Sequence, residues 1–218
     1  ESESRGLGDV YKRQRIYCWR GGMRSASIGW LAEQIDLNPK ILQGGYKAYR
    51  RWAQALFDLT WPLRLMGGRT GTGKTDLLLA LERRGIAILD LEGMANHRGS
   101  SFGGLGLPAQ PTTEHYENKL AEALDRQRLK QAPEIWVEAE SIQVGCCRIP
   151  KGLFDQMKTS PVLEIHRSLD ERVQQLVGVY GHQGAEALAE ATRRISRRLG
   201  PQRTKEALDA IGLSLIHI

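Results

Sequence analysis

One stretch of this chain indicates its fold: Leu63-Arg-Leu-Met-Gly-Gly-Arg-Thr-Gly-Thr-Gly-Lys-Thr75. It satisfies the pattern G-x-x-x-x-G-K-[ST], with Gly68 and Gly73 at the two fixed glycine positions. The apolar run at residues 63–66 predicts a short buried strand, and residues 75–84 predict a helix directly after the glycines. A glycine loop between a strand and a helix N-terminus turns several backbone N–H groups toward phosphate oxygens. The sequence therefore predicts a loop that binds a diphosphate-bearing ligand.

The side chains of this loop and of later strand ends suggest how the ligand is held. We assign the ligand contacts to six loop residues: Gly68, Thr70, Gly71, Gly73, Lys74 and Thr75. Lys74 adds a positive charge, and Thr75 can offer its hydroxyl to Mg²⁺. Three carboxylates at predicted strand ends can orient the Mg²⁺ shell, and we rank Asp90 and Glu138 ahead of Glu140. The sequence has no cysteine or histidine spacing that suggests a metal site built from protein ligands alone.

Strands and helices alternate through the rest of the chain. Further strands are predicted at residues 86–90, 134–140 and 161–166, helices at 113–130, 169–179 and 185–199, and a loop rich in Gly, Ser and Pro at 93–111. Ser168 and Glu171 have the spacing of a capping box at the start of the helix over residues 169–179. This alternation predicts an α/β protein with a doubly wound, mainly parallel sheet flanked by helices.

A second informative stretch, Cys18-Trp-Arg-Gly-Gly-Met-Arg-Ser25, lies near the start of the chain. It follows a predicted strand at residues 15–18 and opens a predicted helix at 25–35. A thiol in front of a helix N-terminus faces backbone N–H groups and the positive end of the helix dipole, which lowers its pKa. Cys18 is therefore a candidate nucleophile, and Arg24 is a candidate brace for a tetrahedral oxyanion. A structural cysteine beside a tight turn is the alternative interpretation.

Composition limits the classes of protein and partner. The chain has 218 residues, of which 41% are hydrophobic, so it can bury one good core and part of another. Its net charge of +6 favours an anionic partner such as a nucleic acid. Four arginines share one face of the predicted helix at residues 185–199: Arg193, Arg194, Arg197 and Arg198. That face can contact RNA phosphates or can simply be solvated.

The cysteines and the ends of the chain bear on its location. Three cysteines form no disulfide framework, and we expect the adjacent Cys146 and Cys147 to be inert. No apolar run reaches the roughly 20 residues of a membrane span, and no segment has the pattern of a signal peptide. We therefore expect a cytoplasmic protein with no membrane partner. Residues 1–14 and 213–218 look like non-native sequence, and we leave them out of the fold prediction.

Two resemblances can be stated on these motifs. The Cys18 loop resembles the active-site loop of rhodanese-like sulfurtransferases and the C-x₅-R-[ST] loop of cysteine phosphatases. From Arg15 to Gly212 the chain resembles the tRNA 2-selenouridine synthase family, because five motifs occur in this order: YCWRGGMRSASIGWL, LQGGYKAYR, GRTGTGKT, LDLEGMANHRGSSFG and WVEAESIQVG. The resemblance implies the C-terminal part of a rhodanese-like domain at residues 15–60 and a P-loop domain at 61–212.

The family resemblance also implies an activity. Its members are transferases that act on the wobble uridine in the anticodon region of tRNA. They convert 2-thiouridine to 2-selenouridine through S-geranyl-2-thiouridine, with geranyl diphosphate and selenophosphate as co-substrates. By this resemblance the loop at residues 68–75 would hold the diphosphate, and Cys18 would act as nucleophile or selenium carrier.

Other functions fit parts of the pattern. A P-loop small-molecule kinase or NTPase would leave Cys18 incidental, and a non-catalytic nucleotide-regulated RNA-binding module would rely on the basic face alone. The resemblance places further strands of the rhodanese-like domain before residue 15. We therefore expect a truncated rhodanese-like unit, with selenium transfer impaired in this chain and diphosphate binding intact.

Overall fold

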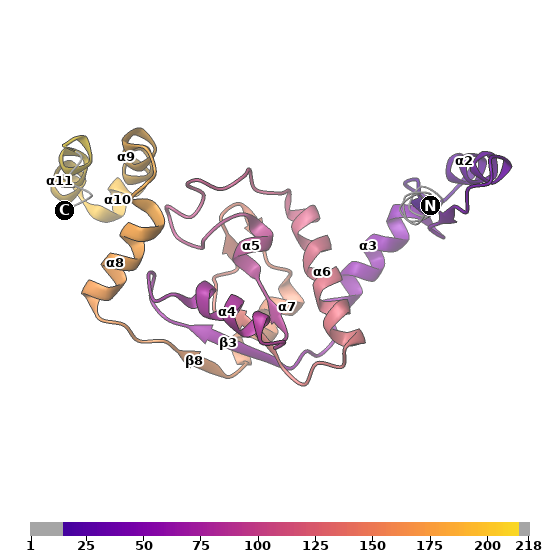
Figure 1. Ribbon diagram of the computed structural model, residues 1–218, viewed down its shortest axis with the longest axis horizontal. Coiled ribbons are helices and arrows are strands. Elements are labelled where there is room, and N and C mark those ends of the chain that lie inside the picture. The colour runs from indigo at the N-terminus through magenta and orange to yellow at the C-terminus, as the bar shows by residue number, and fades with distance from the viewer. Residues whose placement is uncertain (1–14, 214–218) are drawn as a thin grey trace, which may run out of the picture. The chain divides into compact units, whose positions relative to one another are not determined.

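The computed structural model describes residues 15–213 as two compact units that divide between Leu56 and Phe57 (Figure 1). Residues 1–14 and 214–218, which include most of the ends set aside above as non-native, lie outside the described residues.

The first unit is a small α/β arrangement. It consists of β1 (Arg15–Ile16), α2 (Met23–Gln34), β2 (Lys40–Ile41) and α3 (Gly45–Leu56). The two short strands pair in parallel, with Ile16 opposite Ile41. Gly29 of α2 lies directly over the Ile41 side chain, where an added Cβ would collide with it. Whether this unit is part of a rhodanese-like domain stays a prediction.

The second unit is built on a four-stranded parallel sheet with strand order β4-β5-β3-β8. Its elements in chain order are β3 (Leu63–Gly67), α4 (Lys74–Arg83), β4 (Ile88–Leu89), α5 (Leu91–Ala95), α6 (Thr113–Leu129), β5 (Ile135–Glu138), β6 (Gln143–Val144), β7 (Cys147–Arg148), α7 (Lys151–Thr159), β8 (Val162–Glu164), α8 (Leu169–Tyr180), α9 (Ala185–Arg194), α10 (Ser196–Leu199) and α11 (Pro201–Gly212). The pairs β4–β5, β5–β3 and β3–β8 are all parallel. The predicted α/β class with a mainly parallel sheet flanked by helices is therefore confirmed.

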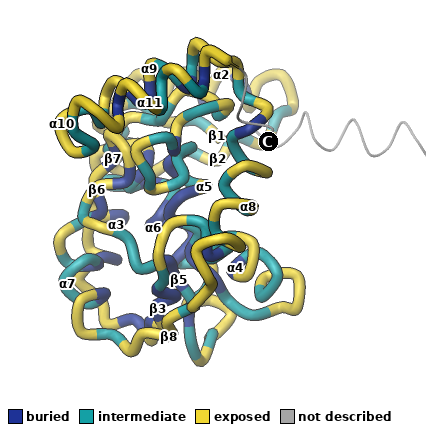
Figure 2. The backbone as a smooth tube through the Cα atoms, turned by 90° about the vertical axis from the view of Figure 1, so that its left-hand side faces the viewer, coloured by how far each residue is buried: buried dark blue, intermediate teal, exposed yellow. Residues whose placement is uncertain are grey.

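The core of this unit lies between the central strands and the helices that cover them. Met66 of β3, Leu78 of α4 and Ile88 of β4 form one buried cluster, with Trp136 and Ile165 packed against its rim. Figure 2 shows the buried residues gathered along β3, β5, α5 and α6, whereas α8 is drawn as intermediate and exposed. Helices cover the faces of a parallel sheet, so its strands are buried on both sides. This is why the strands form where the sequence is most continuously hydrophobic.

The parallel sheet decides where a site can form. In parallel strands the carboxyl ends meet at one edge of the sheet, and the loops that follow them converge there. The loop after β3 contains the glycine motif; Asp90 directly follows β4, Glu138 is the last residue of β5, and Glu140 lies just beyond it.

Several helices depart from the sequence prediction. The helix predicted at residues 185–199 is wrong as one piece, because it ends at Arg194 and restarts at Ser196, with Ile195 at φ −99° and ψ 4° between them. Helix α5 takes up the start of the predicted loop, and α7, α11 and the antiparallel β6–β7 hairpin are elements that the sequence pattern did not predict. None of the helices among residues 15–213 is both long enough and apolar enough to cross a membrane.

Candidate functional site

The phosphate-loop motif connects β3 to α4. Gly68 has φ +140°, and a Cβ there would come within 2.8 Å of the Ile165 carbonyl oxygen and of the Thr72 hydroxyl. Gly73 has φ +80° and directly precedes the first residue of α4, so the helix N-terminus opens onto the loop. The left-handed backbone at Gly73 is one that other residues adopt only with strain. These constraints explain why glycines occupy the fixed positions of the motif.

Two polar side chains of the loop are held by short contacts. The Lys74 ammonium donates to the Gly68 carbonyl at 2.9 Å. The Thr75 hydroxyl donates to Glu92 Oε2 at 2.8 Å. Glu92 was not singled out from the sequence. It is brought to Thr75 by α5, a five-residue helix that follows β4.

Glu92 and Glu140 form a carboxylate pair beside the loop. Both carboxylates crowd Gly99, because a Cβ at that glycine would lie 2.6 Å from Glu92 Oε1 and 2.7 Å from Glu140 Oε2. Burial, and then the neighbouring Glu140, raises the pKa of Glu92 to about 7. Burial also raises the pKa of Glu140, and the Lys74 charge opposes that rise. The two carboxylates can therefore share a proton or bind a cation.

The two carboxylates ranked first from the sequence point elsewhere. Asp90 caps the N-terminus of α5, accepting from the Gly93 N–H at 2.7 Å. Glu138 is fully buried and accepts from the Leu91 N–H at 3.2 Å. Neither lines the pocket at the phosphate loop, whereas Glu140 does. Both lie at strand ends, and their part in orienting Mg²⁺ stays a prediction.

Glu138 links the strand to the helix that holds Glu92. Its Oε2 accepts from the first residue of α5, while its Oε1 is buried with no hydrogen-bond partner in the described part of the chain. Burial raises the pKa of Glu138 to about 8, with the negative charges of Asp90 and Glu92 as lesser causes. Glu138 therefore supports the site from behind as a neutral acid near pH 7.

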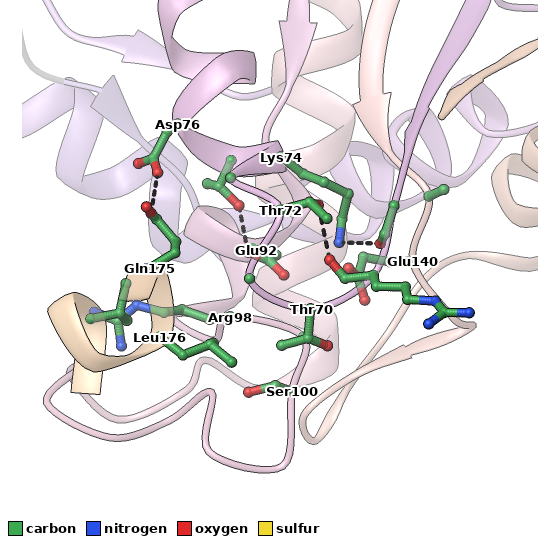
Figure 3. A pocket seen from close by; sticks show the side chains of 18 of the residues that line it. Thr70, Thr72, Lys74, Asp76, Glu92, Arg98, Ser100, Glu140, Gln175 and Leu176 are labelled. Atoms are coloured by element: carbon green, nitrogen blue, oxygen red, sulfur yellow. Dashed lines mark hydrogen bonds between the residues drawn. The ribbon is translucent and has the colours of Figure 1, made fainter. Parts of the chain in front are cut away.

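A cavity of about 410 Å³ opens over the phosphate loop. Its floor is the loop itself, residues 68–76, and the Glu92 and Glu140 pair lies at one side. Residues 98–100 from the segment after α5, Ala139 after β5 and four residues of α8 complete the lining. The cavity thus combines backbone N–H groups, cationic side chains and acidic oxygens within one space (Figure 3).

The Cys18 loop in the first unit is a separate anion-binding candidate. The Gly22 N–H donates to the thiol sulfur at 3.2 Å, and the Ser25 hydroxyl lies 3.3 Å from it. The hydrogen bond to Ser25, and with it the N–H of Gly22, lowers the pKa of the Cys18 thiol to about 6. Helix α2 begins directly after Gly22 with no acidic residue in its first turn, so its dipole also favours the thiolate.

A second helix fixes the backbone of this loop. The Tyr46 and Lys47 N–H groups, in the first turn of α3, donate to the carbonyls of Cys18 and Trp19 at 2.9 and 3.0 Å. Arg24 is exposed in the first turn of α2. The loop therefore presents a thiol of lowered pKa, and an exposed arginine follows it in the first turn of α2; their roles as nucleophile and oxyanion brace stay predictions.

The remaining cysteines and His97, which lies in the segment after α5, have different surroundings. Cys147 is buried with its thiol donating to the Pro111 carbonyl, and burial raises the pKa of this thiol to about 11, whereas Cys146 is exposed. His97 does not line the pocket; its Nδ1 is buried without a partner among residues 15–213. Burial, and then the nearby Arg194, lowers the pKa of His97.

Arg172 contacts the phosphate loop, whereas the four arginines of the predicted basic face are exposed. The Arg172 side chain of α8 donates from Nε to the Thr70 carbonyl at 2.9 Å, so it contacts the backbone of the phosphate loop. The four arginines around Ile195 are all exposed and are divided between α9 and α10.

Sequence reasoning missed Glu92, Arg98 and the inner face of α8. The motif LDLEGMANHRG does contain the first two residues, but nothing in its periodicity shows that a short helix turns Glu92 toward Thr75. The lining residues of α8 are brought over the loop only by tertiary packing.

Comparisons with known proteins agree on one family. A family model described as the tRNA 2-selenouridine synthase AAA domain matches residues 61–216, which takes in four of the residues set aside as non-native. The tRNA 2-selenouridine synthase of Pseudomonas entomophila (strain L48) is 36% identical over 224 residues, covering 92% of this chain and 58% of the relative. That of Alcanivorax borkumensis is 43% identical over 163 residues, covering 73% of this chain and 43% of the relative.

A third relative, the tRNA 2-selenouridine synthase of Pseudomonas fluorescens, is 38% identical over 210 residues, 86% of this chain and 56% of its own length. The chain thus spans about half the length of the curated relatives it matches. The family match alone covers more than half of the chain. On this evidence the chain belongs to the tRNA 2-selenouridine synthase family.

Proposed function

We propose that this chain takes part in converting the wobble 2-thiouridine of tRNA to 2-selenouridine through an S-geranyl intermediate. The co-substrates are geranyl diphosphate and selenophosphate. The observation that carries the proposal is the cavity over the phosphate loop, where the N-terminus of α4, Lys74 and Thr75 meet. Family membership and the Cys18 loop support it.

The first step uses the phosphate loop. The thiouridine sulfur attacks the first carbon of the geranyl group, the carbon–oxygen bond breaks, and its electron pair leaves with the diphosphate, while the base releases its N3 proton to water. Backbone N–H groups of residues 68–75 would stabilise the charge that develops on the leaving oxygens. Lys74 has three N–H donors and uses one on the Gly68 carbonyl, so two remain for phosphate oxygens.

The donor set at the loop also fits a magnesium ion. The Thr75 hydroxyl and the carboxylates of Glu92 and Glu140 are oxygen ligands of the kind that Mg²⁺ prefers. Two carboxylates beside an incoming diphosphate would repel it unless a cation or protons offset their charge. When bound, Mg²⁺ would supply that compensation and polarise a phosphate oxygen.

The second step uses the Cys18 loop. The thiolate attacks the phosphorus of selenophosphate, the phosphorus–selenium bond breaks, and hydroselenide leaves while the phosphoryl group stays on sulfur. Arg24 and the N-terminus of α2 would stabilise the phosphoryl oxygens. Hydroselenide then adds to C2 of the modified base and geranylthiol leaves. Water releases phosphate from Cys18 and restores the thiol.

One experiment tests both steps. The chain is incubated with 2-thiouridine-containing tRNA and geranyl diphosphate, with and without selenophosphate, and the digested nucleosides are weighed by mass spectrometry. We expect S-geranyl-2-thiouridine without selenophosphate and, with it, 2-selenouridine at a reduced yield, because selenium transfer is expected to be impaired in this chain. Lys74→Ala should lower the first product at least tenfold, and Cys18→Ser should remove only the second. Unchanged nucleoside masses, together with triphosphate hydrolysis that needs no tRNA, would contradict the proposal.

A further inference from the structure

Helix α8 presents two different faces. Leu169, Val173 and Val177 are 68%, 49% and 41% exposed and recur every fourth residue on the outer side. Leu176 and Val179, by contrast, are half-buried and line the cavity over the phosphate loop. The inner face therefore gives this cavity an apolar wall opposite its charged floor.

Three contacts hold the inner face of α8 against the phosphate loop. Arg172 donates to the Thr70 carbonyl at 2.9 Å, and Gln175 donates to Asp76 Oδ2 at 2.8 Å. At Gly71 an added Cβ would lie 3.1 Å from Leu176 Cγ, so the helix rests directly on the loop (Figure 3). The wall is thus fixed at short range from the place where phosphates bind.

The aromatic ring of Tyr180 ends the wall. Its hydroxyl lies 3.1 Å from the Ser100 hydroxyl, and the Arg98 guanidinium lies 5.6 Å from the ring centroid. Phe102 packs against the same ring at a centroid distance of 6.0 Å. The segment after α5 therefore orients the ring, and the polar end of Tyr180 is already engaged.

The wall favours an alkyl group over a nucleoside. Leu176 and Val179 offer no hydrogen-bonding group to the edge of a base, and the Tyr180 hydroxyl is paired with Ser100. A hydrocarbon chain gives up no hydrogen bonds when it contacts such a surface, and its transfer out of water is favourable. The cavity thus has the chemistry of a site for a diphosphate that carries a hydrocarbon group.

We propose that Leu176, Val179 and Tyr180 form the binding site for the hydrocarbon group esterified to the diphosphate and that they select its length. This inference rests on the proposed function, because it assumes that the diphosphate lies on residues 68–75. It adds a specificity-determining surface on α8 to the phosphate-binding residues of the loop.

The test is a calorimetric binding series on the chain as it stands. The ligands are methyl, dimethylallyl and geranyl diphosphate, which have the same charged group and differ only in the length of the hydrocarbon. We expect geranyl diphosphate to bind at least tenfold more tightly than methyl diphosphate, since about 1.4 kcal/mol of added burial corresponds to that factor. Equal affinities across the series would overturn the proposal while leaving the phosphate site standing. Failure of every diphosphate to bind would overturn the proposed function as well.

Variants of α8 locate the site within the helix. Val179→Ala should weaken the binding of geranyl diphosphate about fivefold to tenfold by removing two methyl groups that the hydrocarbon would contact, and should leave the binding of methyl diphosphate unchanged. Val177→Ala, the same substitution on the outer face, is the matched control and should change neither affinity. Thermal unfolding of each variant checks that α8 remains folded. An equal effect of both substitutions, or a Val179→Ala loss that is the same for both ligands, would place the hydrocarbon elsewhere.

Discussion

At the scale of single residues, the Ser25 hydroxyl has one hydrogen and two acceptors within reach. It donates to the Gly22 carbonyl at 3.0 Å and lies 3.3 Å from the Cys18 sulfur. When the thiol loses its proton, the hydroxyl can turn and donate to the thiolate. Ser25 is 2% exposed, so water does not readily replace it in that role. The charge of Cys18 is therefore linked to the orientation of one buried side chain.

This arrangement predicts the pH dependence of Cys18 alkylation. The pKa of the thiol is lowered to about 6, so the thiolate fraction rises with pH and is nearly complete by about pH 7. The rate of iodoacetamide labelling should level off there. In Ser25→Ala the largest cause of the lowered pKa is gone, and the half-maximal rate should move to higher pH.

Mass spectrometry of the individual cysteine peptides measures this rate. Cys147, whose pKa is raised to about 11 by burial, is the internal reference and should stay unlabelled over the same range. Superimposable pH profiles of the wild type and Ser25→Ala would show that the hydroxyl has no part in activating Cys18.

The residue scale also shows what sequence patterns could not predict. A strand-end carboxylate can be found from the sequence, but the turn that follows it decides where the next acid goes. After Glu138 the chain bends at once, with the Glu140 N–H donating to the Glu138 carbonyl at 2.9 Å, and Glu140 enters the cavity. Asp90 instead caps α5, and that helix brings Glu92 to the site. Hydrophobic periodicity predicts neither turn, because each turn depends on a single local hydrogen bond.

At the scale of elements, α8 contains a glycine that its surroundings do not require. A Cβ at Gly178 would have no heavy atom within 4 Å. Gly178→Ala should therefore stabilise the chain by about 0.5–1 kcal/mol, because alanine costs less entropy in a helix. Urea denaturation followed by circular dichroism measures the change.

A neighbouring glycine is the matched control for this substitution. At Gly181, which ends the helix, a Cβ would lie 2.6 Å from the Val177 carbonyl oxygen. Gly181→Ala should therefore destabilise the chain where Gly178→Ala stabilises it. The same sign for both would mean that local space does not control the stability of α8.

Elements with strong end signals were predictable. Helix α4 follows the glycine motif as expected, and the capping box of Ser168 and Glu171 on α8 is confirmed, with both reciprocal hydrogen bonds present. The break at Ile195 carries no Gly or Pro to announce it, so the predicted helix ran through it. Helix α11 does have a start signal in the sequence, Gly200 followed by Pro201 at its first turn, although no helix was predicted there. Short helices such as α5 depend on tertiary packing more than on propensity.

At the scale of the whole molecule, the positive charge predicts salt-dependent RNA binding. The chain carries a net charge of +6, and Arg197 and Arg198 are exposed. If they contact phosphates, Arg197→Gln with Arg198→Gln should reduce the slope of log affinity against log salt by about 2. Filter binding of tRNA over a range of salt concentrations measures this slope.

Charge-matched variants separate a local contact from a general effect. Arg83 and Arg84, at the end of α4, are also exposed, and replacing both with Gln removes the same charge. We expect little change in slope from that pair. Equal changes from the two pairs would mean that net charge alone, and no particular face, attracts the RNA.

The overall architecture was predictable in class but not in arrangement. The alternation of strands and helices around the glycine motif is enough to indicate a parallel sheet. The order β4-β5-β3-β8 is not contained in any local pattern, since β3 pairs with β5 and β8, which both lie far along the chain. The cavity could not be predicted from local patterns either, because residues from the loop, α5 and α8 line it together.

One strand of that sheet has a practical consequence for handling the protein. β8 is the last strand in its sheet among the described residues, and Val162 and Leu163 are 58% and 52% exposed on it. Such an edge is a template for aggregation, and mutual repulsion between like-charged molecules is what opposes it at low ionic strength. Added salt weakens that repulsion over about 10 Å at 0.1 M. Solubility should therefore fall as salt rises, so concentrated stocks keep best in dilute buffer.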